Sequence, residues 1–198
     1  MLVFNKNILT IGGNRLEGES LTPPEPPTPP APSFDEVTIG TQTWKNVNLA
    51  VDDGQGGIVY MTVNYGQGNV TEYFYTWDAA VRVAATVQGW HLPTKDEWDT
   101  LISTIGGTNS GAKLKSTYGW YDNNGTDDYG FSAFPSGNWN FNTSENPNVT
   151  MTGIYWSATE RSSSAVQTTR MTWQDQTINS SWYGMKSVGY PVRLIKDT

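Results

Sequence analysis

The sequence predicts an α+β domain in which strands and loops outnumber helices. Three observations support this class. Residues 75–106 contain two amphipathic helical patterns, residues 37–44, 58–63 and 154–198 contain patterns typical of strands, and residues 107–150 are rich in Gly, Asn, Ser and Thr. The chain has 198 residues, with 9 Trp and 10 Tyr, which supplies enough apolar surface for one core and a tail.

Residues 1–33 precede this domain and divide into two parts. Residues 22–33 read TPPEPPTPPAPS, and their prolines favour an extended polyproline conformation. They predict a semi-rigid linker, with a ligand for a proline-recognising domain as the alternative. Residues 1–21 are too few to fold alone, although they include the apolar side chains Val3, Phe4, Ile8, Leu9 and Ile11. We expect them to form an N-terminal anchor or docking segment for a larger assembly, and we expect the folded domain to span residues 34–198.

The first elements of the domain are a hairpin, a strand and a helix. Residues 37–44, VTIGTQTW, predict a hairpin that turns at Gly40 and Thr41, and residues 58–63 alternate as a strand. A helix follows, and Gly89 ends it. Its predicted apolar face has the spacing i, i+3, i+4 and i+7 and consists of Trp77, Ala80, Val81 and Ala84.

A second helix begins after an aromatic turn. Thr94 and Glu97 form a capping box, and Gly106 and Gly107 end the helix. Its predicted buried face is Trp98, Leu101, Ile102 and Ile105.

The second half of the chain predicts long loops and then strands. Residues 107–150 carry scattered aromatic side chains that we expect to fix the loops to the core: Trp120, Tyr129, Phe131, Phe134 and Trp139. Near the C-terminus, Met171 and Trp173 share one strand face, while Arg170, Thr172 and Gln174 share the other. A similar alternation places Val192 and Leu194 opposite Arg193 and Lys196.

Composition excludes several classes of function. The formal net charge of -7 and the pI of about 4.6 oppose binding to nucleic acid. The absence of cysteine excludes disulfides, thiolate nucleophiles and cysteine metal sites. No apolar run is long enough to cross a bilayer, so we expect no membrane insertion. Residues 1–13 lack the pattern of a secretory signal, so either that route is not used or a preceding signal has been removed.

We predict no enzymatic activity. The single histidine, His91, lies in the aromatic turn, where a structural role is expected rather than that of a general base. Asp52 and Asp53, like Asp127 and Asp128, are adjacent pairs in Gly-rich turns, where carboxylates usually stabilise the turn. Neither pair has a spacing typical of a glycosidase, and a carbohydrate-active enzyme is the alternative hypothesis.

Over residues 37–195 the chain resembles the Fibrobacter succinogenes major paralogous domain, found in bacterial surface and phage proteins. The motifs that carry the resemblance are IGTQTW, NVNLA, YTWDAA, GWHLPTKDEWDTLI, GAKLKS, NGTDDYGFSAFPSG, YWSATE and GYPVRLIKD. The resemblance implies a C-type lectin-like fold, with two helices packed on a twisted antiparallel sheet, paired N- and C-terminal strands and long loops. Residues 92–98, LPTKDEW, also resemble formylglycine-generating enzymes, but those enzymes work through cysteines that this chain lacks.

We predict no cofactor, with calcium left open at one loop. Residues 122–128 are rich in oxygen ligands, but their spacing is not that of a twelve-residue calcium loop, and an Asx-type turn explains them without an ion. The triplets Glu-Pro-Asn and Gln-Pro-Asp, by which calcium-dependent lectins bind sugars, are absent.

Residues 160–189 are the candidate recognition segment. They are dominated by Ser, Thr, Asn, Gly, Tyr, Trp and Arg, the composition typical of an antibody binding surface. The predicted ligand-binding residues are Arg161, Arg170, Thr172, Gln174, Asn179, Ser181, Trp182 and Tyr183. The remaining tryptophans assigned to the core are Trp77, Trp90, Trp98, Trp156 and Trp173.

Two hypotheses for function follow. The first is a receptor-binding head of a phage tail or virion protein, which would bind a bacterial surface protein or glycan. The motifs YWSATE and GYPVRL around a variable interior resemble proteins diversified by retroelements, and a tail fibre would be compatible with a homotrimer. The second is a bacterial cell-surface or lipoprotein module with a structural or adhesive role. The corresponding locations are the virion tail and the extracellular bacterial surface.

Overall fold

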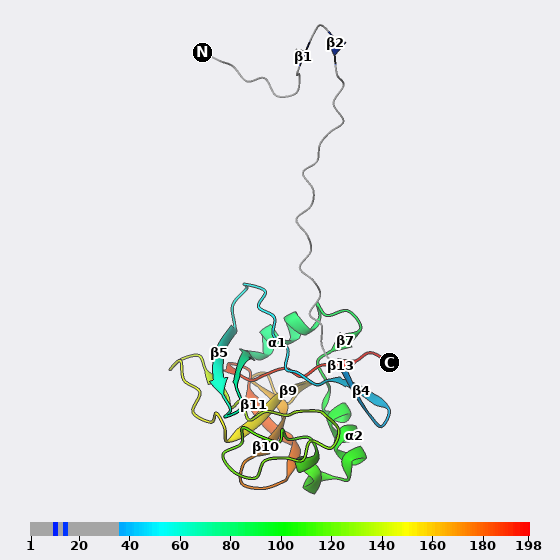
Figure 1. Ribbon diagram of the computed structural model, residues 1–198, viewed down its shortest axis with the longest axis vertical. Coiled ribbons are helices and arrows are strands. Elements are labelled where there is room, and N and C mark those ends of the chain that lie inside the picture. The colour runs from blue at the N-terminus through cyan, green and yellow to red at the C-terminus, as the bar shows by residue number, and fades with distance from the viewer. Residues whose placement is uncertain (1–9, 12–13, 16–35) are drawn as a thin grey trace. The chain divides into compact units, whose positions relative to one another are not determined.

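The computed structural model describes residues 10–11, 14–15 and 36–198, and the chain divides into two units, residues 1–33 and residues 34–198. In the first unit, β1 (Thr10–Ile11) pairs in antiparallel fashion with β2 (Asn14–Arg15). The rest of the predicted anchor, and the predicted linker at residues 22–33, lie outside the described residues. The second unit is a mixed α+β domain of mostly antiparallel strands with three helices (Figure 1).

A four-stranded sheet joins the two ends of the second unit. β3 (Glu36–Ile39) and β4 (Gln42–Lys45) form the predicted hairpin, in which Gly40 adopts a φ of 62° at the turn. β13 (Ile195–Lys196) pairs with β4, and β7 (Trp90–His91) pairs with β13, so the strand order is β3-β4-β13-β7. The C-terminal strand therefore lies directly beside the N-terminal hairpin.

Helix α1 (Trp77–Ala84) follows a second hairpin, made of β5 (Ile58–Asn64) and β6 (Asn69–Tyr75). The helix exists as predicted, but it ends before Gly89, and its predicted face is confirmed at Ala80 and Ala84 and wrong at Val81. Val81 is 40% exposed, and the buried side chains are Ala79, Ala80, Val83 and Ala84. The alanine-rich side allows close packing, and a Cβ built on Gly57 would lie 3.3 Å from the Ala79 Cβ.

Helix α2 (Lys95–Ile105) confirms its prediction. The Thr94 side chain accepts from the Glu97 N–H, and the Glu97 carboxylate accepts in return from the Thr94 N–H at 2.7 Å. Gly106, with a φ of 110°, ends the helix. The buried residues are the four expected, Trp98, Leu101, Ile102 and Ile105.

A three-stranded antiparallel sheet carries the candidate recognition segment. It consists of β9 (Thr152–Glu160), β10 (Ala165–Thr172) and β11 (Ile178–Met185), in the order β11-β10-β9. β11 lies at the edge of this sheet (Figure 1). A separate two-stranded sheet pairs β8 (Trp139–Asn140) with β12 (Val188–Gly189).

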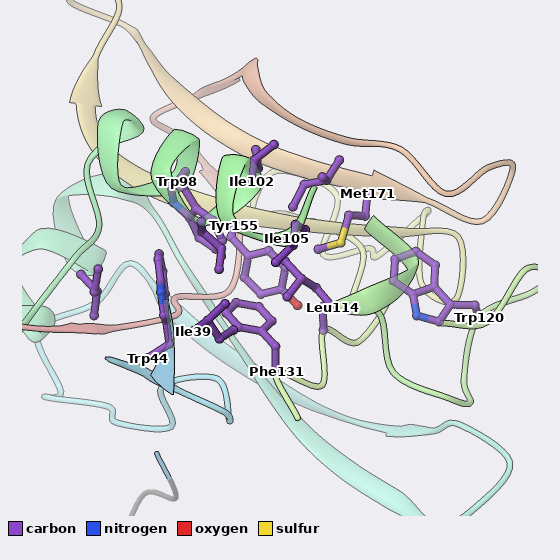
Figure 2. Packing of buried hydrophobic residues seen from close by; sticks show 14 residues of the cluster. Ile39, Trp44, Trp98, Ile102, Ile105, Leu114, Trp120, Phe131, Tyr155 and Met171 are labelled. Carbon is purple, nitrogen blue, oxygen red and sulfur yellow. The ribbon is translucent and has the colours of Figure 1, made fainter. Parts of the chain in front are cut away.

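The core consists of two apolar clusters. In the first, the rings of Trp44 and Trp98 lie 4.8 Å apart between centroids, and Phe131 meets both rings edge-on (Figure 2). The second cluster joins the α1 alanines to Trp156 and Tyr190. Of the tryptophans assigned to the core, Trp90, Trp98 and Trp156 are buried. The other two, Trp77 and Trp173, are only partly buried and pack against the clusters from outside.

Arg193 contradicts the alternation predicted for the C-terminal strand. It is 1% exposed, and β13 contains only Ile195 and Lys196. The guanidinium lies 4.4 Å from the Phe131 ring and donates hydrogen bonds to oxygen atoms of Lys45, Asn48, Phe131 and Ser132. Because these oxygens replace water around the charge, the segment before β13 can bury this side chain, which connects the loops to the N-terminal hairpin.

A buried lysine organises the loop-rich half of the domain. Lys115 follows the short 3₁₀ helix η1 (Thr108–Lys113) and is completely buried. Its ammonium donates to the backbone carbonyl oxygens of Asn123, Thr172 and Asp175 and lies 4.3 Å from the Trp120 ring. Burial lowers the pKa of Lys115 to about 8, against the opposing influence of the carboxylates of Asp175 and Asp122. This one charge therefore connects residues 122–128 to the end of β10.

Candidate functional site

Two large aromatic side chains are exposed next to each other on the edge strand β11. Trp182 is 42% exposed and Tyr183 is 51% exposed. Met185, which the sequence analysis did not single out, lies two residues further along the same strand and is 47% exposed. Large apolar side chains gathered on one edge strand are unusual for a surface without a partner.

Each of the two rings is covered by an arginine. The guanidinium carbon of Arg170 lies 4.5 Å from the Trp182 ring centroid, and that of Arg161 lies 4.4 Å from the Tyr183 centroid. The two rings are stacked, with centroids 6.5 Å apart and an interplanar angle of 22°. We call these four residues the arginine–aromatic face. The contacts run in series from Arg161 to Tyr183, from Tyr183 to Trp182 and from Trp182 to Arg170, and each cation attracts the ring that it contacts.

Local strand geometry brings these side chains together. Trp182 and Tyr183 pair in regular register with Thr168 and Gln167, and the register between β10 and β11 shifts directly beside them. Thr168 pairs with Trp182 and Arg170 pairs with Asn179, so Ser180 and Ser181 together oppose one residue of β10. Such an irregularity twists the strand and redirects its side chains. The Asn179 side-chain oxygen accepts from the Ser181 N–H at 2.8 Å, which fixes the shift.

The turn before β10 positions Arg161. The Ala165 carbonyl oxygen accepts from the N–H groups of both Arg161 and Ser162, at 3.0 and 2.9 Å. The Ser162 hydroxyl in turn accepts from the Ala165 N–H at 3.1 Å. This closed turn holds the Arg161 backbone while its side chain reaches the ring of Tyr183.

The face carries positive charge on an acidic chain. Neither Arg161 nor Arg170 takes part in an ion pair among the described residues. Glu160, the neighbour of Arg161, is paired with Lys186 at 2.7 Å. The pKa of Asp175 is lowered chiefly by hydrogen bonds from Thr177, and only to a smaller degree by Arg170. The two guanidinium groups therefore keep capacity for an anionic partner.

Two of the predicted residues do not join this face. The Thr172 carbonyl oxygen accepts from Lys115, and its hydroxyl oxygen is buried with no hydrogen-bond partner among the described residues. Gln174 is exposed in the turn that follows β10. Within residues 36–198, neither of these two side chains contacts the ring of Trp182 or the ring of Tyr183. Asn179 and Ser181 shape the strand, as described above.

The remaining polar clusters lie within turns and at the chain end. His91 lies between Asp197, 2.7 Å from Nδ1, and Glu97, 2.8 Å from Nε2. Asp53 accepts two hydrogen bonds from Arg82, which lower its pKa to about 2. In the oxygen-rich loop at residues 122–128, both carboxylate oxygens of Asp127 accept hydrogen bonds from Ser132, one from its N–H and one from its hydroxyl. In the part of the chain that the structure describes, no three His, Cys, Asp or Glu side chains gather as a metal site would require.

Comparison with known protein families shows to which family the chain belongs. The family model described as the Fibrobacter succinogenes major domain matches residues 37–196. The chain belongs to this family. The Fibrobacter succinogenes major domain thus covers both main helices and every strand from β4 to β13, including the arginine–aromatic face.

Comparisons with curated proteins and with solved structures give no match. No helix among the described residues is long and apolar enough to cross a membrane.

Proposed function

We propose that residues 34–198 form a non-enzymatic recognition domain that binds its ligand through the arginine–aromatic face. The observation that carries this proposal is the pair of exposed rings on β11, each covered by an arginine that has no ion pair among the described residues. Trp, Tyr and Arg are the residue types that contribute most to binding energy at protein interfaces.

The face is suited to binding because it is held rigidly before a ligand arrives. Three of its four residues, Arg170, Trp182 and Tyr183, lie on paired strands, and the stacked planar groups restrict one another. The Ser180 hydroxyl donates to the Asp99 carboxylate on α2, which anchors the edge strand to the core. A rigid face loses little conformational entropy on binding, so more of its contact energy contributes to affinity.

The charge of the face indicates the chemistry of its ligand. Two guanidinium groups without acidic partners favour a ligand that carries carboxylate or phosphate groups. The exposed rings add flat apolar area for a sugar ring or an aromatic side chain. An acidic surface glycan or an acidic protein segment has both properties.

The wider setting is also part of the proposal. We propose a C-type lectin-like fold, supported by α2 packed against an antiparallel sheet and by the pairing of β4 with β13. We propose that the domain acts as the host-attachment head of a phage tail or virion protein, with a surface that a retroelement diversifies. A structural or adhesive module on the bacterial surface is the competing function.

A strain-panel experiment tests the proposal. The labelled full chain is titrated against intact bacteria of many strains, with and without a calcium chelator. Saturable binding to some strains only, abolished in the Arg161→Gln/Arg170→Gln variant, supports recognition by this face. A matched control is Tyr60→Ala, because Tyr60 is 63% exposed on β5 and lies outside the face. Absence of binding to every strain, also with an artificially trimerised chain, would favour the structural module.

A further inference from the structure

A second feature of the surface is a shallow hollow on a different part of the domain. It has a volume of about 450 Å³, within the range of about 300–1,000 Å³ typical of small-molecule sites. One wall is the turn between β5 and β6, and the other is the segment from residue 118 to residue 124, with Thr150 at the rim. Its lining includes the side chains of Asn64, Gln67, Tyr118, Tyr121, Asn124 and Thr150.

The lining has a distinctive chemistry. None of the residues that line the hollow is Asp, Glu, Lys, Arg or His, so the site offers no charge to an ionic ligand or a metal ion. It offers three carboxamides, the Thr150 hydroxyl, three tyrosine rings and one indole instead. Carboxamides both donate and accept hydrogen bonds, as sugar hydroxyls do. The negative face of an aromatic ring attracts the C–H groups on the flat side of a pyranose.

Two of the carboxamides are held in place by their own loops. The Asn64 side-chain oxygen accepts from the Gly66 N–H at 2.8 Å, and the Asn124 side-chain oxygen accepts from the Trp120 N–H at 3.1 Å. The NH₂ group of each has no hydrogen-bond partner among the described residues. Each asparagine therefore presents donors whose orientation is fixed by the bond that its oxygen makes.

The floor of the hollow is tightly packed. Gly119 has a φ of 94°, and a Cβ at this position would lie 3.0 Å from the Tyr65 ring. Tyr65 is 5% exposed, is stacked on Phe134 at 4.9 Å, and donates its hydroxyl hydrogen to Glu72. Only a glycine allows the backbone to approach the ring this closely. The floor therefore cannot collapse into the site.

The rim holds a strained residue. Thr150 is β-branched, yet its φ is 67°, in the left-handed region that such residues rarely adopt. Two hydrogen bonds hold it there: its N–H donates to the Pro135 carbonyl oxygen, and its carbonyl oxygen accepts from the Tyr121 N–H. Strain that is maintained in this way concentrates at functional sites. Tyr121 is 69% exposed, and its ring is steadied by an edge-on contact with Trp173 at 5.1 Å between centroids.

We propose that this hollow binds a neutral saccharide, with a sugar ring on Tyr121 and its hydroxyl groups on Asn64, Gln67 and Asn124. The site differs in chemistry from the arginine–aromatic face, because it is uncharged, and the proposal does not depend on that face. The domain would then have two binding sites, one for an acidic group at β11 and one for a neutral sugar at the hollow. The two groups could belong to one glycan or to two different ligands.

Isothermal titration of the full chain with cellohexaose, maltohexaose and mannohexaose tests this proposal, with hexagalacturonate as the acidic counterpart. We expect saturable binding of at least one neutral hexasaccharide, weakened about tenfold or more by Tyr121→Ala and by Gln67→Ala. Both side chains are exposed, so the variants should fold, and melting temperatures verify this. Tyr60→Ala is the matched control and should bind as the unmodified chain does.

Three outcomes would overturn the proposal: no neutral hexasaccharide binds at millimolar concentration, the Tyr121→Ala variant binds unchanged, or only hexagalacturonate binds. The Trp182→Ala/Tyr183→Ala variant separates the two sites. It should keep saccharide binding at the hollow while losing attachment to cells. Loss of hexasaccharide binding in that variant would place the sugar on β11 and refute the hollow as the site.

Discussion

Replacing Lys115 with methionine is expected to destabilise the loop-rich half of the domain. Methionine fills a similar volume and tolerates an irregular environment, so the change mainly removes the charge and its hydrogen bonds. The carbonyl oxygens of Asn123, Thr172 and Asp175 would then each lose a donor. Because these oxygens belong to two distant segments, the connection between residues 122–128 and β10 would be lost.

The size of the effect follows from these bonds. A hydrogen bond from a charged donor contributes about 1.5–3 kcal/mol, and a carbonyl left without a partner costs about 1–3 kcal/mol. Asn123 and Asp175 are exposed residues, so water can replace part of what is lost there. The variant also avoids the cost of burying an ammonium group. We therefore expect the free energy of unfolding at pH 7 to fall by about 2–4 kcal/mol.

The pH dependence gives a second readout. Burial lowers the pKa of Lys115 in the folded chain from 10.5 to about 8, so between these values the unfolded chain binds more protons. The contribution of this group to the free energy of unfolding therefore rises with pH over that interval, and the methionine variant lacks it. Urea unfolding at pH 7 and at pH 10 measures the free energy of unfolding of the unmodified chain and of the Lys115→Met variant. The difference between these two free energies should grow with pH.

The exposed pair of Lys196 and Glu36 supplies the control for this experiment, since Lys196→Met should cost less than about 1 kcal/mol. A Lys115→Met variant as stable as the unmodified chain at pH 7, or a difference that shrinks as the pH rises, would refute the reasoning.

Three further predictions concern stability. Thr94→Ala removes the capping box of α2 and should lower the free energy of unfolding by about 1 kcal/mol in urea titration, whereas an unchanged midpoint would contradict that role. His91→Gln tests the chain end: burial acts to lower the pKa of His91, but hydrogen bonds with its two carboxylate partners outweigh it and raise the pKa above 6.5. The stabilisation by protonated His91 is therefore complete below pH 6.5 and is lost as the pH rises through the raised pKa. The free energies of unfolding of the unmodified chain and the variant, measured in urea, should differ by up to about 1 kcal/mol at acidic pH and converge in alkaline buffer. Gly119→Ala forces a Cβ toward the Tyr65 ring at a positive φ and should destabilise by about 1–3 kcal/mol in thermal melts, and a neutral result would mean that the floor of the hollow can adjust.

Features fixed by local sequence were predicted well. The α2 helix has its start, its end and its buried face encoded within residues 94–107, and all three are confirmed. The hairpin turning at Gly40 is equally local. On α1, Ala80 and Ala84 were predicted correctly, but Val81 is exposed while Ala79 and Val83 are buried, because close packing against the neighbouring strands turns the alanine-rich side inward.

Features that depend on distant residues were not predictable in the same way. Nothing near Arg193 reveals that oxygen atoms from residues 45, 48, 131 and 132 surround it, so the strand pattern placed it outside. Composition did identify Trp182, Tyr183, Arg161 and Arg170, but the contact of Arg170 with Trp182 spans the register shift between β10 and β11, and the contact of Arg161 with Tyr183 joins β11 to the turn before β10. The hollow joins residues 64–67 to residues 118–124, and no pattern in the chain connects them.

The most direct test of the proposed recognition face compares binding with stability in the Trp182→Ala/Tyr183→Ala variant. Both rings are about half exposed, so the variant should lose only about 1–2 kcal/mol of unfolding free energy. Its affinity for a strain that binds the unmodified chain should fall about a hundredfold or more. Unchanged binding, or a loss of about 3–5 kcal/mol in stability as expected for core aromatic residues, would contradict the assignment of this face to recognition.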